Sequence, residues 1–175
     1  DTQIVLHVML LVAFGIKAAV FPLSAWLPDS YPTAPAPVTA VFAGILTKIG
    51  IYSIIRAHAL LLPGAGLDHV LLVAALLTML VGIFGAIAQS DIKRLLSFTL
   101  VSHIGFMMFG VALSSQPGMS GAIYYVAHHI IVQTTLFLVL GLIERQAGTS
   151  ALRHLGGLAA TPLLAFVFLV PALNL

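Results

Sequence analysis

Long apolar runs, separated by short stretches of ionic residues, proline and glycine, make up almost the whole chain. A helix that spans a bilayer needs about 20 mostly apolar residues. The pattern therefore predicts five complete membrane-spanning helices, near residues 4–26, 38–57, 70–88, 95–113 and 121–143, and the start of a sixth near 161–175. Short loops make consecutive helices antiparallel neighbours. We expect an all-α, polytopic transmembrane helix bundle that forms one domain over residues 1–175.

Composition supports a membrane protein and excludes several function classes. Of the 175 residues, 61% are hydrophobic and 7% are charged, whereas a soluble domain has about 25% charged residues. The seven Lys and Arg form no basic patch, which argues against a nucleic-acid partner. The absence of Cys excludes disulfides and thiolate metal sites. Because we find no phosphate-binding glycine loop, activated nucleophile or paired carboxylates, we expect no cofactor and no enzymatic chemistry.

The distribution of basic residues predicts an orientation in the membrane. Four of them follow the first, third and fifth spans, and only Arg56 falls on the other face; the four are Lys93, Arg94, Arg145 and Arg153. The positive-inside rule places the face with four basic residues in the cytoplasm. Asp91 is a candidate N-cap for the fourth span, and Asp29 is expected to accept backbone hydrogen bonds in the proline-rich turn.

Two lysines lie within apolar spans, where a charge costs roughly 2.5 to 3.5 kcal/mol on insertion scales. Lys48 is near the centre of its span. Lys17 precedes Pro22, whose ring removes a hydrogen bond to the carbonyl of Ala18 and predicts a helix break beside the amine. Backbone freed in this way needs water or protein partners, which indicates a hydrated cavity and a path for protons. In the alternative interpretation, the Lys17 amine extends to the membrane interface.

The fourth and fifth spans carry a further polar group. His103 is in the middle of the fourth span, and His129 and Gln133 share one face of the fifth, from which His128 points roughly 100° away. These residues indicate either a proton or cation path or hydrogen bonds between helices. We expect no metal site, because no carboxylate or Cys lies at ligand spacing. Four histidines near span ends are expected to be interfacial or solvated: His7, His58, His69 and His154.

Three segments resemble the antiporter-like subunits shared by Mrp-type multisubunit Na+/H+ antiporters and respiratory complex I. They are AFGIKAAVFPLSAWLPDSYPTAPAPVTAVFAGILTKIGIYSIIR (13–56), DIKRLLSFTLVSHIGFM (91–107) and IYYVAHHIIVQTTLFLVLGLIER (123–145). The first combines two lysines, a proline at a helix break, Trp-Leu-Pro-Asp and an Ala-Pro turn, and within the superfamily it is most similar to the D subunit of Mrp antiporters. The chain begins without Met and ends in an apolar run, so we expect a fragment of a fourteen-helix subunit.

The resemblance implies roles for individual residues. The fragment would supply helices seven to eleven and the start of twelve. Lys17 would be the helix-seven lysine that is coupled to a glutamate on helix five, and Lys48 the bridging lysine of helix eight. His103 and His129 would belong to the central polar axis. Many family members have lysine where this chain has Gln133, which removes an ionisable step there.

The resemblance also implies a function: a subunit of a monovalent cation/proton antiporter in the bacterial cell (inner) membrane. The subunit would conduct protons, with Na+ as a second candidate ion, and would work with the other subunits of a complex in the lipid bilayer. One alternative is a proton-pumping membrane subunit of NADH-quinone oxidoreductase (complex I). Another is a membrane scaffold, in which the polar residues only hold helices together.

Overall fold

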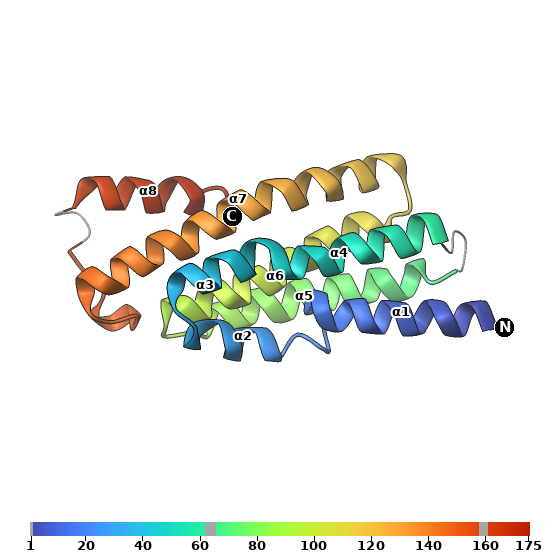
Figure 1. Cartoon of the computed structure of the whole chain (residues 1–175), viewed down its shortest axis with the longest axis horizontal. Coiled ribbons are helices and arrows are strands. Elements are labelled where there is room, and N and C mark those ends of the chain that lie inside the picture. The colour runs from blue at the N-terminus through green and yellow to red at the C-terminus, as the bar shows by residue number, and fades with distance from the viewer. Residues whose placement is uncertain (1, 62–65, 158–160) are drawn as a thin grey trace.

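The computed structural model describes residues 2–61, 66–157 and 161–175 (Figure 1). Within these ranges the secondary structure is helical, apart from one isolated antiparallel bridge between Asp91 and Ala151. Figure 1 shows long helices running roughly parallel to one axis, with the N-terminus at one end. The predicted all-α helix bundle is confirmed.

Four continuous helical segments are long and apolar enough to cross a membrane. The first, Ala36–Leu60, joins α3 (Ala36–Val41), the π-helix η2 (Phe42–Leu46), α4 (Thr47–Arg56) and the start of the π-helix η3 (Ala57–Leu61). The others are α5 (Asp68–Ile87), α6 (Ile92–Ala112) and α7 (Gln116–Ala147). The remaining helices are shorter: α1 (Thr2–Ala18), α2 (Trp26–Ser30), η1 (Tyr31–Thr33), η4 (Leu152–His154) and α8 (Pro162–Ala172).

Residues 4–26 do not form one continuous helix, although the length of the apolar stretch alone would predict one. α1 ends at Ala18, Ala19 has a φ of 61°, and helical structure resumes only at Trp26. Pro22 lies within the intervening turn, where it has no N–H to donate to a continuing helix. The backbone around Ala18 and Ala19 is nonetheless buried, so the break lies in the protein core.

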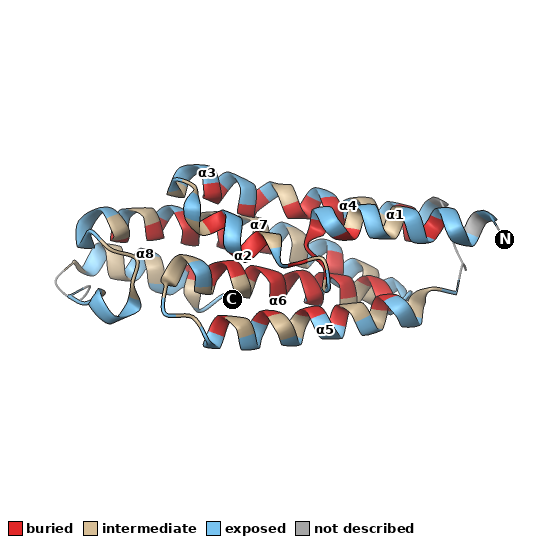
Figure 2. Ribbon diagram, turned by 90° about the horizontal axis from the view of Figure 1, so that it is seen from below, coloured by how far each residue is buried: buried red, intermediate tan, exposed pale blue. Residues whose placement is uncertain are grey.

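α6 occupies the centre of the described bundle. It packs against α5 on one side and α7 on another, and α1 packs against α4. In the most apolar stretch of α6, 67% of the residues are buried, against 28% in α5. Figure 2 shows the same contrast, with buried positions along most of α6 and many exposed positions on α5. Ser97, Ser102 and His103 of α6 are buried and therefore face other helices.

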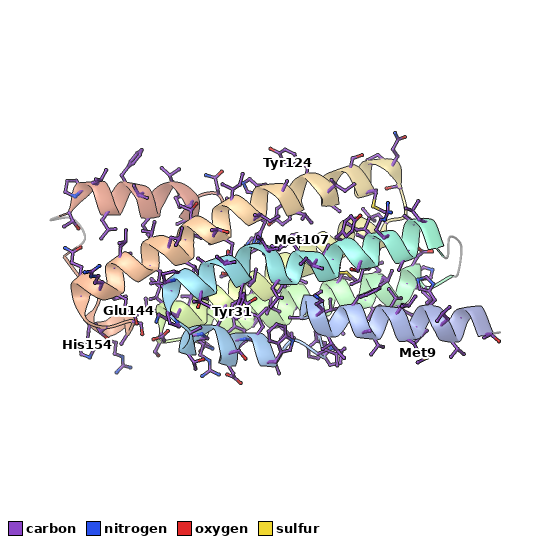
Figure 3. All side chains as sticks on the ribbon, viewed as in Figure 1. Met9, Tyr31, Met107, Tyr124, Glu144 and His154 are labelled. Carbon is purple, nitrogen blue, oxygen red and sulfur yellow. The ribbon has the colours of Figure 1, made fainter. Side chains whose placement is uncertain are left out.

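One end of the bundle, called the basic end below, carries four of the seven basic residues: Lys93, Arg94, Arg145 and Arg153. Asp91 accepts hydrogen bonds from the backbone N–H groups of Lys93 at 2.9 Å and Arg94 at 3.1 Å, which confirms it as the N-cap of α6. The Lys93 amine also pairs with Glu144 at 2.7 Å. Glu144 is labelled in Figure 3. Arg56 is the last residue of α4 and lies toward the opposite end (Figure 1).

The prediction for Asp29 is wrong. Its carboxylate is exposed and pairs with the guanidinium of Arg94 at 2.7 Å, and no backbone donor of the turn reaches it within the described residues. The turn is held instead by Thr39, whose hydroxyl donates to the carbonyl of Tyr31 at 3.0 Å. The ion pair ties α2 to the start of α6.

Candidate functional site

Lys48 is buried in the bundle without an acidic partner. Its side chain is 3% exposed, and its Nζ donates a hydrogen bond to the carbonyl oxygen of Ala43 at 2.5 Å. Ala43 belongs to the π-helix η2, whose wider turns alter the hydrogen bonding of the carbonyls that precede Lys48. Among the described residues, no carboxylate pairs with this amine. The burial predicted for Lys48 is therefore present, and its observed partner is a neutral backbone group.

A glycine brings α7 close to this π-helix. A Cβ atom placed on Gly44 would lie 2.3 Å from Oγ1 of Thr134, so only glycine permits this approach without a shift. The contact places α7, the helix that carries His129 and Gln133, beside the segment that carries Lys48. η2 contacts α7, and α4 contacts α6, so the segment that carries Lys48 adjoins both helices that carry His103 and His129.

His103 from α6 and His129 from α7 form a pair of buried rings. Their centroids are 4.8 Å apart. Nδ1 of His103 is hydrogen-bonded to the hydroxyl of Tyr125, which is on the same helix face as His129, one turn earlier. Neither ring nitrogen of His129 has a partner among the described residues. Since buried polar groups are usually hydrogen-bonded, His129 has the capacity to bind a further proton donor or acceptor.

His128 and Gln133 extend this arrangement in two directions. The His128 ring is partly exposed, and its centroid lies 6.0 Å from that of Tyr125. Gln133 is buried one turn beyond His129, where its Nε2 donates to the carbonyl of Leu96 at 3.1 Å. Its Oε1 has no partner within the described part of the chain. Gln133 thus links α7 to α6 and leaves one acceptor available.

Lys17 is not brought into this group. Its side chain lies on the exposed side of α1, and its amine has no ion pair or hydrogen bond with any other described residue. The following residue, Ala18, packs against Gly50 of α4, where a Cβ on the glycine would lie 2.7 Å from the Ala18 nitrogen. The expected burial of Lys17 is therefore wrong for the described residues, because α1 turns the opposite side toward α4.

The cavity beside Pro22 also differs from the expectation. A space of about 210 Å³ adjoins the helix break, but the side chains that line it are apolar and include Val20, Phe21, Leu23 and Met108. Such a lining offers no polar side chain to hold water. The prediction of a hydrated cavity at the break is thus not met by the described residues. Among them, no group of three His, Asp or Glu residues is arranged to hold a metal ion.

Sequence reasoning missed two features of this region and the burial of two histidines elsewhere in the bundle. Tyr125 could have been found, because its spacing from His129 places both on one helix face. The π-helix before Lys48 has no comparable local signal. The prediction that His7 and His58 are interfacial or solvated is wrong, since both are buried.

The chain was compared with known families, proteins and structures. The family model described as "NADH:quinone oxidoreductase/Mrp antiporter, TM" matches residues 1–175. The chain is 45% identical over 174 residues to the D subunit of the Na(+)/H(+) antiporter of Alkalihalophilus pseudofirmus, and the match covers 98% of this chain and 35% of the relative. It is 38% identical over 159 residues to an NAD(P)H-quinone oxidoreductase chain 4 of Microcystis aeruginosa, covering 90% and 29%.

The fold is also similar to a solved assembly. A chain in the structure of the Mrp complex from Dietzia sp. matches with a TM-score of 0.93 and 40% sequence identity, over 96% of this chain and 32% of that one. The present chain spans about a third of the length of the curated relatives it matches. It therefore corresponds to one section of their fold.

Proposed function

Because the chain belongs to the NADH:quinone oxidoreductase/Mrp antiporter transmembrane family, we propose that it forms the central part of a D-type subunit of a multisubunit Na+/H+ antiporter. The sequence resemblance to antiporter-like subunits is thereby confirmed. The protein would be a multi-pass component of a bacterial cell membrane. Its partners would be the other subunits of the complex, and its ions would be protons and Na+.

In the proposed mechanism, the Lys48 amine exchanges a proton with the imidazoles of His103 and His129. The ammonium releases its proton and becomes a neutral amine, while the receiving ring becomes an imidazolium. Two observations carry this proposal. Among the described residues, the buried Lys48 amine is held by a backbone carbonyl alone, and the two nitrogens of the buried His129 ring have no partner. His129 belongs to α7, the helix that packs against η2. An imidazole has one nitrogen that can accept a proton and another that can donate one, which suits it to a relay.

Tyr125 and His128 would continue the path from this pair toward the partly exposed surface of α7. The Tyr125 hydroxyl holds the His103 ring by its Nδ1, and the Tyr125 ring adjoins His128. The Gln133 amide is neutral and does not take up a proton, so it would act by orienting neighbouring polar groups. Its bond to the Leu96 carbonyl would keep α7 in register with α6.

Lys17 would act from the other side of α4. Its amine is on the exposed face of α1, where the family resemblance implies a carboxylate from a helix that precedes this section. The contact of Ala18 with Gly50 joins the end of α1 to the turn that follows Lys48. A change in the ionic state of Lys17 would reach Lys48 through this packed contact.

The chief alternative is a proton-pumping membrane subunit of a quinone oxidoreductase, which the similarity to quinone oxidoreductase chain 4 relatives supports. The two functions use the same helices and differ in the proteins with which the subunit assembles. Co-purification of small antiporter subunits would support the first, and of peripheral iron–sulfur subunits the second.

The test is replacement of Lys48 in the complete subunit within its complex. Lys48→Ala should abolish Na+-dependent proton exchange in everted vesicles, while the amount of assembled complex stays close to that of the parent. Lys93→Gln is the matched control, because it removes a lysine at the basic end. Retained exchange in Lys48→Ala would contradict the proposal. Loss of assembly with normal exchange per assembled complex would favour the scaffold interpretation.

A further inference from the structure

A second polar cluster lies at the end of the bundle opposite the basic end. It contains His7 of α1, His58 of η3, Asp68 at the start of α5 and Ser114 in the turn between α6 and α7. Nε2 of His58 is 3.0 Å from Oδ1 of Asp68 and 3.0 Å from Oγ of Ser114. The Ser114 hydroxyl donates to the same carboxylate, and the rings of His7 and His58 are 5.9 Å apart. These four residues, called the His58 cluster, come from four separate segments.

Burial within the His58 cluster increases in steps from the surface inward. The Asp68 side chain is 42% exposed, whereas His58 is 8% and His7 is 0% exposed. Both nitrogens of His7 and Nδ1 of His58 lack partners among the described residues. The cluster therefore joins an accessible carboxylate to two buried imidazoles that have free capacity to bind a proton.

Among the described residues, His58 has one ionic partner. Asp68 supplies the negative charge, and His7 is the other titratable group that faces His58. On α4, the guanidinium of Arg56 lies over the ring of Tyr52, 5.8 Å from its centroid. On α5, His69 is exposed and outside the cluster, and the α6–α7 turn contributes only the neutral Ser114.

We propose that the His58 cluster is a proton-binding site that exchanges with the aqueous phase at this end of the bundle. It is separate from the Lys48 site, which comprises Lys48, His103 and His129. A hydronium ion delivers its proton to the His58 imidazole, leaving water, and the Asp68 carboxylate stabilises the resulting imidazolium. His7 is the second acceptor, deeper in the bundle. The site would serve proton entry or exit in the proposed function, but its protonation can be measured independently of transport.

The direct test is ¹⁵N-histidine NMR of the complete subunit in its complex, with His58→Gln used to assign the His58 signal. The His58 signal should change from imidazolium to neutral imidazole as the pH of the sample is raised. In the isosteric variant Asp68→Asn, the imidazolium fraction at about pH 6 should fall. His69→Gln, the neighbouring exposed histidine, is the matched control and should leave the signal unchanged.

Three results would overturn the proposal: a His58 signal that stays neutral at every pH measured, one that is unaffected by Asp68→Asn, or one that responds to Na+ at constant pH. The last would indicate a metal-cation site instead. A transport measurement separates this proposal from the proposed function. Asp68→Asn should change how exchange depends on the pH of the compartment at this end, whereas Lys48→Ala should abolish exchange at every pH. Exchange in Lys48→Ala alongside a titrating His58 would refute only the proposed function.

Discussion

The amine of Lys48 donates a hydrogen bond to the carbonyl oxygen of Ala43, 2.5 Å away, within the turns that surround a π-helix. A carbonyl is neutral, so it orients the amine without fixing a counter-charge beside it. A carboxylate in the same place would favour the ammonium and oppose proton release. The geometry therefore suits an amine that alternates between its charged and neutral forms.

Tyr125 is expected to support exchange through its bond to His103. Tyr125→Phe leaves Nδ1 of His103 without this partner, at a cost of about 1–3 kcal/mol if the nitrogen stays buried and unsatisfied. We expect exchange to slow by about tenfold, as a shift of about 1.4 kcal/mol in the barrier would produce. The measurement is the initial rate of Na+-driven proton movement per assembled complex.

The neighbouring residue offers a matched control for this change. Tyr124 is exposed and points away from the bundle in Figure 3, and its ring adjoins His128 rather than His103. Tyr124→Phe should leave the rate unchanged. Equal rates in the two variants would show that the Tyr125 hydroxyl has no role in exchange.

Gly50 is expected to be essential for the packing of α1 on α4. A methyl group there would lie 2.7 Å from the Ala18 nitrogen and 2.9 Å from its Cα, and these backbone atoms cannot move aside as a flexible side chain would. Gly50→Ala should lower the stability of the complex by about 1–3 kcal/mol, as overpacking usually does. Thermal unfolding of the purified complex measures this effect.

Gly121 provides the comparison, because a Cβ placed on it meets nothing within 4 Å of the described structure. Gly121→Ala should be neutral or stabilising by up to about 1 kcal/mol, since alanine favours helix. A melting temperature that falls equally in both variants would argue against the close contact at Ala18.

Asp91 should contribute to stability as the N-cap of α6. Its carboxylate accepts two backbone hydrogen bonds and one from Ser150. Asp91→Ala should therefore destabilise the subunit by about 1 kcal/mol. Asp29→Ala removes only an exposed ion pair, worth at most about 1 kcal/mol and often less. Chemical denaturation should show a larger loss of stability for Asp91→Ala than for Asp29→Ala. A larger loss of stability in Asp29→Ala would contradict the capping role.

The helices could be predicted from sequence because bilayer thickness fixes the length of an apolar span. The run of residues 70–88 predicts a span where α5, Asp68–Ile87, is observed. Lys48 could be predicted to be buried since apolar residues extend far on both sides of it. The helix break at Pro22 could likewise be predicted, because proline has no backbone N–H to donate to a continuing helix.

The sequence could not predict which side of each helix faces a neighbour. α1 is apolar on all sides, so its pattern does not indicate that Lys17 points outward while His7 is buried. The burial of His58 depends on the meeting of α1, α5 and the α6–α7 turn, which local periodicity does not encode. Lys48, His103 and His129 come from three different helices, so their grouping likewise depends on tertiary contacts that the sequence pattern does not encode.

The account depends most on release of a proton by Lys48, and Lys48→Arg tests that step. Arginine keeps the positive charge but does not deprotonate in proteins. Exchange should therefore fall by about 100-fold, the scale of a lost proton-transfer group. Lys93→Arg makes the same substitution beside Glu144 at the basic end and should have no effect. The measurement is Na+-driven proton movement in proteoliposomes that contain equal amounts of intact complex. Loss of exchange in Lys48→Arg alone is the predicted result, and a rate equal to that of the parent would contradict the account.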